Sequence, residues 1–226
     1  MTSRRILETK YRISETAMAL FLEEGYENVT VEAVAEASRV SRRTVFRHFE
    51  SKDELAFPDH NERIGLVERS LLESAPDVDP IEAVIAATEE SLRDFLSRPE
   101  LVLRRYKLTR VVPELRRREV IEHERYVTLT RSFLRDHFPP DAPPFQSMGI
   151  AALVDAIHRS ALGDWARSGG ATDAVAELAA GMEWVRRLVA QESTFSTTPL
   201  LLAVLPDAPQ TRRVLNSLKD TAEELL

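Results

Sequence analysis

The sequence predicts an all-α protein in which an N-terminal three-helix unit with a helix-turn-helix precedes a larger helical domain. Three observations predict this class. Apolar residues recur every three or four positions, as on a helix, and no strand-like run appears. All 12 prolines lie at or beyond Pro58 and divide the rest of the chain into pieces of helical length. The first 55 residues carry closely spaced signals for helix starts and ends. We expect about nine or ten helices.

Composition excludes several classes of protein. The chain has 226 residues and no cysteine, which excludes disulfide scaffolds, thiolate nucleophiles, Cys-ligated zinc and Fe–S clusters. Its 7 glycines form no phosphate-binding loop. No segment is apolar enough for a membrane span or a signal peptide, so we expect a cytoplasmic protein without a membrane partner. The net charge of −7 argues against general coating of nucleic acid and requires any such contact to be local.

The N-terminal helices follow from their capping residues. A first helix over about 3–24 ends at Gly25, which suits a left-handed C-terminal position. Thr30 is the expected N-cap of a short helix over 31–38, and Ser41 that of a helix over 42–48. The run Ser51-Lys52-Asp53-Glu54 is typical of a capping box and predicts the start of a fourth helix. Pro58 either breaks that helix at Phe57 or bends it.

The helix over 42–48 concentrates positive charge. Between Ala37 and Glu50 there is no acidic residue, whereas four arginines fall there: Arg39, Arg42, Arg43 and Arg47. Val45 and Phe49 face inward, so Arg43 and Arg47 lie on the outer face with Thr44 and His48 beside it. A solvated helix surface is the alternative interpretation. Because this is the second helix of a capped helix-turn-helix, we favour DNA binding, with arginine contacting guanine edges.

Residues 5–57 resemble the DNA-binding domain of the tetracycline-repressor (TetR) family. The resemblance rests on Ala17-x-x-Leu20-Phe21-x-x-x-Gly25-Tyr26, on Thr30-Val31-x-x-Val34-Ala35 and on the run from Val40 to Phe49 with Ser51, Lys52 and Leu55. It implies a homodimer that binds a double-stranded DNA operator and whose second domain binds an unknown small-molecule effector that weakens DNA binding. It also implies that Thr30 and Lys52 contact phosphates, while Arg42, Arg43, Thr44 and His48 enter the major groove.

Two positions depart from the family pattern. Arg39 stands where the turn usually has glycine, so either a left-handed conformation there costs about 1–2 kcal/mol or the turn relaxes differently. Phe46 lacks the aromatic hydroxyl that is commonly offered to a phosphate, which shifts this contact to Arg47.

The second domain is predicted at 58–192, after a DNA-binding domain at 1–57 and before a C-terminal extension at 193–226. Two amphipathic segments, 148–167 and 172–190, are rich in small residues that allow close helix approach. They predict either a homodimer interface near 148–190 or a helical hairpin within one chain. The family resemblance favours the dimer.

Candidate ligand-binding residues are aromatic, soft or titratable groups on apolar helix faces: Tyr106, Tyr126, Phe133, Met148, His158 and Trp165. Ordinary core packing is the alternative for each of them. The cations between Arg104 and Arg118 face only Glu114 in the neighbouring sequence, which indicates either a solvated helix surface or an anionic ligand. The histidines have no metal-binding spacing, so we predict no metal, no cofactor and no catalytic residue.

The function that this pattern favours is a ligand-responsive transcriptional repressor that binds a palindromic operator as a homodimer and is released by a small molecule. An enzyme would need an acid/base pair, an activated nucleophile or a cofactor loop, and none emerges. The remaining alternative is a DNA-binding regulator without an effector, whose second domain only dimerises or recruits a partner.

Overall fold

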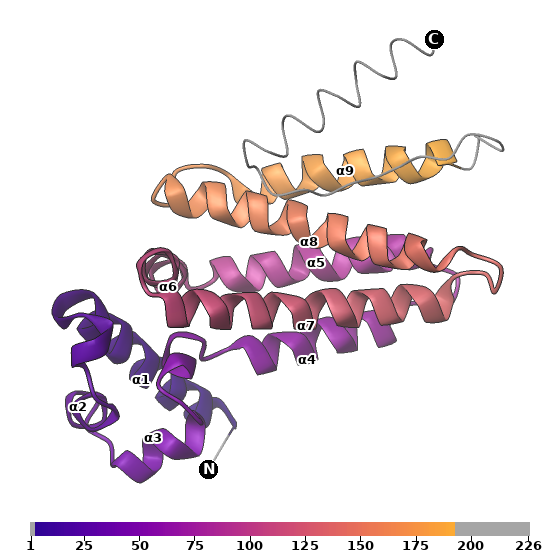
Figure 1. The fold of residues 1–226 in the computed structure, drawn as a ribbon. Coiled ribbons are helices and arrows are strands. Elements are labelled where there is room, and N and C mark those ends of the chain that lie inside the picture. The colour runs from indigo at the N-terminus through magenta and orange to yellow at the C-terminus, as the bar shows by residue number, and fades with distance from the viewer. Residues whose placement is uncertain (1–2, 193–226) are drawn as a thin grey trace. The chain divides into compact units, whose positions relative to one another are not determined.

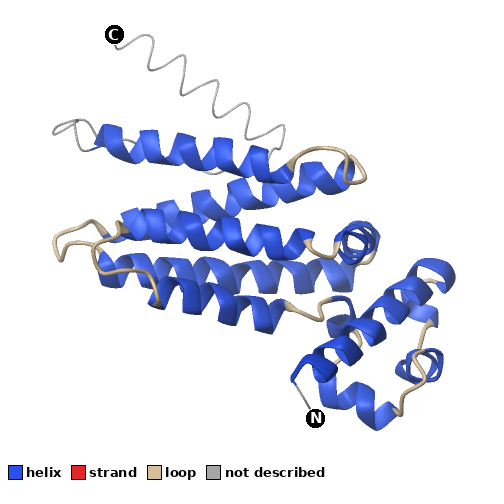
Figure 2. Cartoon of the chain, turned by 180° about the vertical axis from the view of Figure 1, so that it is seen from behind, coloured by secondary structure: helices blue, strands red, loops and turns tan. Residues whose placement is uncertain are grey.

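A computed structural model describes residues 3–192, and the regular structure in this range is helical (Figures 1 and 2). The described residues up to Val189 form one compact unit. None of the described helices is long and apolar enough to cross a membrane. The predicted extension at 193–226 lies outside the described residues.

The N-terminal helices begin and end where their capping residues predict. Helix α1 spans Ser3–Glu24, a short 3-10 helix η1 spans Tyr26–Asn28, and α2 and α3 span Val31–Ala37 and Arg42–His48. The Thr30 hydroxyl accepts a hydrogen bond from the Ala33 amide at 3.1 Å, and the Ser41 hydroxyl accepts one from the Thr44 amide at 3.1 Å. Gly25 has φ 87° and therefore uses backbone freedom that other residues lack.

The predicted start of the fourth helix was wrong. Residues Asp53–Ala56 form only a 3-10 helix, η2, and no side chain caps it. Glu54 instead turns back and accepts a hydrogen bond from the Glu50 amide at 2.7 Å, which removes it from a capping box with Ser51. The chain breaks at Phe57, passes through a turn at Pro58, and starts α4 at His60–Leu72. This is the first of the two outcomes that Pro58 predicts.

The remaining helices each follow a loop. They are α5 (Pro80–Leu96), α6 (Pro99–Val111), α7 (Pro113–His137), α8 (Pro144–Arg167) and α9 (Ala174–Glu192). In α5 to α8 a proline occupies the first turn, where its missing amide hydrogen and fixed φ cost nothing. Figure 1 shows α4, α5, α7 and α8 running alongside one another, with α6 crossing at one end.

Two apolar cores hold the described residues together. One fills the space between α4, α5, α7, α8 and α9, with Leu92, Leu134 and Met182 fully buried. The other lies beneath α1, α2 and α3 and is completed by residues from α6 and α7, among them Leu108 and Leu115. Packing therefore crosses the domain boundary that we predict at residue 57: α1 contacts α6, and η2 contacts α7.

Candidate functional site

The outer face of α3 carries two arginines without partners. Val45 and Phe49 are buried and fix the inner face of the helix. Arg43 and Arg47 are exposed, and neither makes an ion pair or a side-chain hydrogen bond with any residue that the structure describes. Their guanidinium groups keep all their donors available. Such a face can bind guanine edges or phosphates without first breaking an internal contact.

Arg42 is held differently. Its Nε lies 2.8 Å from Glu32 Oε1 on α2, and its guanidinium sits 5.2 Å from the centre of the exposed Phe46 ring. Both charged side chains of this ion pair are more than half exposed, so the pair contributes at most about 1 kcal/mol. Arg42 can therefore leave Glu32 at little cost.

Thr44 and His48 lie half-buried at the side of the arginine face. The Thr44 hydroxyl is 2.9 Å from the Ser41 hydroxyl, so it is engaged in the N-terminal cap of α3. His48 Nε2 is buried and has no hydrogen-bond partner among the described residues. Burial and then the Arg47 charge lower the pKa of His48, so its ring is neutral at pH 7.

The two predicted phosphate contacts lie outside α3. The Thr30 hydroxyl caps α2, as described above. The Lys52 ammonium donates a hydrogen bond to the Tyr26 carbonyl and lies 4.2 Å from the centre of the Tyr26 ring. A phosphate contact by Lys52 would have to compete with this internal hydrogen bond. The sequence could not predict this hydrogen bond, because Lys52 and Tyr26 are far apart in the chain.

The turn between α2 and α3 is strained at Arg39. This exposed residue has φ 55°, in the left-handed region that favours glycine. The left-handed alternative expected from the sequence is thus the one that the backbone adopts. Arg39 is a further exposed cation close to the start of α3, and its side chain has no ion pair or hydrogen bond with any residue that the structure describes.

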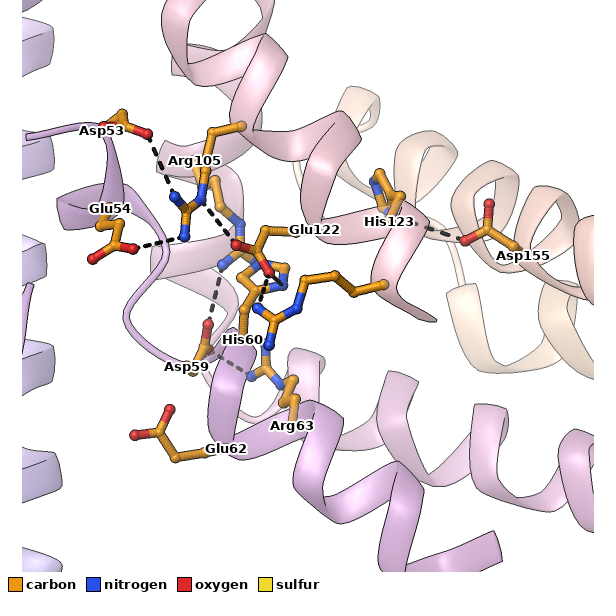
Figure 3. A network of polar contacts seen from close by, with 12 residues as sticks. Asp53, Glu54, Asp59, His60, Glu62, Arg63, Arg105, Glu122, His123 and Asp155 are labelled. Atoms are coloured by element: carbon orange, nitrogen blue, oxygen red, sulfur yellow. Dashed lines mark hydrogen bonds and ion pairs between the residues drawn. The ribbon is translucent and has the colours of Figure 1, made fainter. Parts of the chain in front are cut away.

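A buried ionic cluster lies where the helix-turn-helix joins α4 (Figure 3). Asp59 is only 1 % exposed and faces two arginines: Arg63 Nη2 at 2.8 Å and Arg105 Nη1 at 3.3 Å. Arg63 also donates to Asp94 on α5 at 2.6 Å, and its guanidinium lies 3.6 Å from the centre of the Phe95 ring. The start of α4 is therefore fixed against both α5 and α6.

A second set of ionic contacts ties η2 to α7. Glu122 is 1 % exposed and accepts from Arg118 Nε at 2.9 Å and from Arg125 Nη1 at 2.7 Å. Arg118 also donates to Glu54 at 2.8 Å. The interpretation of the cations over 104–118 as a solvated surface is wrong for Arg105, which is buried, and Arg118 pairs with acids from two different elements. Neighbouring sequence cannot reveal such partners.

A cavity of about 40 Å³ lies between α4, α5, α7 and α8. Its walls combine apolar side chains with titratable ones, the latter being His60, His123, Tyr126, Asp155 and His158. His60 is 6 % exposed, and burial together with the Arg105 charge lowers its pKa well below the usual value. Burial also lowers the pKa of His158 to about 4 and raises the pKa of Tyr126 above its usual value.

Two of the six predicted ligand-binding residues, Tyr126 and His158, line this cavity. The other four lie elsewhere. Tyr106 lies beside Arg110, Phe133 stacks on His137 at 4.1 Å, Met148 is 52 % exposed, and Trp165 is in the core. The sequence analysis missed His60 and His123. Both histidines lie on helix faces that point inward, which the sequence could have indicated. Histidines in an ordinary core have the same pattern, so the sequence cannot tell the two cases apart.

No three His, Asp or Glu side chains within the described part of the chain converge as metal ligands would.

Known proteins resemble this chain in sequence at its N-terminus. Residues 13–57 match the family model described as bacterial regulatory proteins, tetR family. The HTH-type transcriptional regulator TcmR of Streptomyces glaucescens is 46% identical over 56 residues, which is 25% of this chain and 25% of that protein. The sequence match therefore spans about a quarter of the relative and includes α2 and α3.

Solved structures resemble the chain over most of its length. NalD of Pseudomonas aeruginosa, the secondary repressor of the MexAB-OprM multidrug efflux pump, matches with a TM-score of 0.55 at 23% identity, covering 80% of this chain and 96% of NalD. FadR of Thermus thermophilus, a repressor solved in complex with lauroyl-CoA, matches with a TM-score of 0.52 at 19% identity, covering 88% and 100%. These likenesses show a shared fold. The likeness in sequence to the tetR family of bacterial regulatory proteins covers residues 13–57.

Proposed function

We propose that the protein is a ligand-responsive transcriptional repressor that binds a palindromic DNA operator as a homodimer and is released by a small molecule. The observation that carries the proposal is the arginine face of α3, defined by Arg43 and Arg47. It is unpaired and exposed, and it lies on the second helix of the segment that matches the family. In this proposal Arg43 contacts a base edge, Arg47 contacts a phosphate, and Thr30, Arg42, Thr44, His48 and Lys52 complete the interface.

The DNA-binding role is tested with a duplex selected from a random-sequence library, compared with a scrambled duplex of the same composition. We expect Arg43→Ala to weaken binding to the selected duplex by about 1–3 kcal/mol and to change binding to the scrambled duplex little, because a base contact is lost. Arg47→Ala should weaken binding to both duplexes and reduce the salt dependence, because a phosphate contact releases counterions. Fluorescence anisotropy at several salt concentrations measures both effects.

Arg69→Ala is the matched control, because it removes the same charge from an exposed position on α4. It should leave both affinities unchanged. If all three variants lose affinity equally, the binding is non-specific attraction and the assignment of roles within α3 is wrong.

The proposed homodimer uses the outer faces of α8 and α9. Ala176, Ala180 and Trp184 lie on one face of α9 and are exposed in the single chain, Trp184 by 44 %. On α8, a Cβ built at Gly149 or Gly163 would meet nothing within 4 Å. Small residues on two neighbouring helices allow the equivalent helices of a second copy to approach closely.

The proposed effector site is the cavity between α4, α5, α7 and α8. Three of its side chains keep polar atoms without partners, which supports binding of a hydrogen-bonding molecule. A specific observation also favours the alternative of a regulator without an effector: about 40 Å³ holds roughly three water molecules, at about 10–15 Å³ for each. An effector of larger size must therefore part the cavity walls.

The proposed route from the cavity to DNA runs through the contacts that fix the helix-turn-helix. His60 lines the cavity and follows Asp59, whose carboxylate holds Arg63 and Arg105. Lys10 on α1 lies 2.9 Å from Glu62 on α4, which ties the first helix to the same element. An effector would act by its different affinity for two arrangements of these contacts.

A further inference from the structure

The cavity contains buried polar atoms that the protein itself leaves unsatisfied. Both ring nitrogens of His60, the hydroxyl of Tyr126 and Nε2 of His158 are buried and have no hydrogen-bond partner among the described residues. His60 Nδ1 is 3.9 Å from Glu122 Oε2, which is too long for a hydrogen bond. Leaving such a buried group unpaired destabilises the folded protein. The contents of the cavity must therefore supply partners.

Two of the three side chains lie against the Phe95 ring, and the third lies against His60. The ring centres of His60 and His158 each lie 5.9 Å from that of Phe95, and the ring centre of Tyr126 lies 6.1 Å from that of His60. The remaining walls nearby are apolar, with Val67 on α4 and Val154 on α8. Once the walls part beyond the present volume of about 40 Å³, a single small molecule can contact the polar groups at one end and the apolar walls with its body.

The three polar groups carry no charge at neutral pH. Burial keeps both imidazoles unprotonated and the phenol protonated, so each group offers one donor and one acceptor. The charges nearby are already paired: Arg63 and Arg105 with Asp59, and Asp155 with Arg159 at 2.8 Å. A ligand ion of either sign would lose its hydration without gaining a free counter-charge, which is unfavourable.

We propose that this cavity is a binding site for an uncharged molecule whose apolar ring bears hydroxyl or carbonyl oxygens, with His60, Tyr126 and His158 as its hydrogen-bonding partners. The binding site itself does not depend on the proposed function. Only the expected consequence, that a bound ligand changes DNA binding, rests on it. Hydroxyl and carbonyl oxygens match groups that both donate and accept. The ring matches the apolar walls around Phe95.

Three probes of similar shape separate the alternatives: p-cresol is neutral and has a hydroxyl, toluene is neutral without one, and p-toluate is an anion. The chain has 5 histidines, and only His60, His123 and His158 line the cavity. Their ring proton signals can be followed by NMR on the full-length protein at pH 7.5. We expect p-cresol to shift the signals of His60 and His158 in a saturable way, with those of His48 and His137 unchanged.

Tyr126→Phe removes only the cavity hydroxyl. It should weaken p-cresol binding about fivefold to tenfold and leave toluene binding unchanged, as expected for the loss of one hydrogen bond. Tyr106→Phe is the matched control, because Tyr106 does not line the cavity, and it should change neither affinity.

Absence of saturable shifts with p-cresol, equal binding of p-toluate and p-cresol, or equal effects of the two Tyr→Phe substitutions would each overturn the proposal. Binding of the selected duplex is measured in the same samples. If p-cresol does not bind in a saturable way while specific DNA binding persists, the proposed ligand site is wrong and the proposed function stands. If specific DNA binding is absent while p-cresol binds as expected, the proposed function falls and the binding site stands.

Discussion

Arg39 illustrates how a single residue can oppose its own backbone. Its φ of 55° places a residue with a Cβ and a long charged side chain in a conformation that glycine adopts without cost. The exposed side chain makes no ion pair or hydrogen bond with any described residue that would offset the strain. The arginine therefore costs stability at the turn that orients α3, and its positive charge lies on the surface proposed to meet DNA.

We expect Arg39→Gly to raise the free energy of unfolding by about 1 kcal/mol relative to Arg39→Ala, because both variants lose the charge but only glycine relieves the strain. Urea unfolding followed by circular dichroism measures the difference. Equal stability of the two variants would show that the turn does not hold this conformation in solution.

Asp59 illustrates the opposite case, in which a buried charged residue neutralises its neighbours. It is 1 % exposed and faces Arg63 and Arg105, which are themselves buried. Removing one partner of a buried ion pair is typically far more costly than removing a surface charge, because it leaves the other charge unpaired. The cluster thus fixes the start of α4 relative to the helix-turn-helix.

At the scale of elements, two glycines in neighbouring helices have different environments. A Cβ built at Gly181 on α9 would lie 2.3 Å from Ile157 Cγ2 on α8, whereas one built at Gly163 on α8 would meet nothing within 4 Å. Gly181 therefore allows α9 to lie against α8 within the same chain. This contact belongs to the helical hairpin that the sequence analysis gives as the alternative to a dimer, and it leaves the outer faces of both helices available.

We predict that Gly181→Ala lowers the free energy of unfolding by about 1–3 kcal/mol, because the β-branched Ile157 cannot move aside without disturbing the core. Gly65→Ala on α4, where a built Cβ would meet only the Arg69 guanidinium at 3.5 Å, serves as its matched control and should raise stability by up to about 1 kcal/mol through helix propensity. Thermal unfolding of both variants checks the pair. A stabilised Gly181→Ala protein would contradict the close approach of the two helices.

At the scale of the whole molecule, dimerisation can be separated from folding. Ala180 is exposed on α9, so Ala180→Arg should leave the protomer folded but block the approach of a second copy. Light scattering after size exclusion should show a dimer for the natural chain and a monomer for the variant. Thr128→Arg, at an exposed position on α7, is the control and should remain a dimer. A dimeric Ala180→Arg protein would move the interface away from α9.

The buried histidines predict how stability depends on pH. Burial lowers the pKa of His158 to about 4, and burial with the Arg105 charge lowers that of His60, from an unfolded value of 6.5. Below pH 6.5 the unfolded chain therefore binds more protons than the folded one. The free energy of unfolding is therefore unaffected by the titration of these histidines above pH 6.5. It falls as the pH drops toward 4, by about 1.4 kcal/mol per pH unit for each histidine that is buried as a neutral ring.

Urea unfolding between pH 7.5 and 5 measures how the free energy of unfolding depends on pH. His158→Phe should reduce the slope by about 1.4 kcal/mol per pH unit, because one histidine fewer takes up a proton on unfolding. A slope that is unchanged in the variant would show that His158 is not buried as a neutral ring in solution.

The sequence by itself determined the local structure of this protein. Thr30 and Ser41 cap α2 and α3, four prolines begin α5 to α8, and Val45 with Phe49 turns Arg43 and Arg47 outward. These features depend on neighbours within about four positions, where helix geometry decides which side chains meet. For the same reason the arginine face of α3, and with it the resemblance of the N-terminal residues to the tetR family, could be recognised from the residues alone.

Only the tertiary structure decided what the second domain brings together. Asp59 meets Arg105 across 46 positions and Glu54 meets Arg118 across 64, and His60 joins Tyr126 and His158 around one cavity. An acidic or histidine side chain has the same sequence signature whether it is solvated or buried. Its burial depends on which helix faces pack against it, and those faces come from distant parts of the chain.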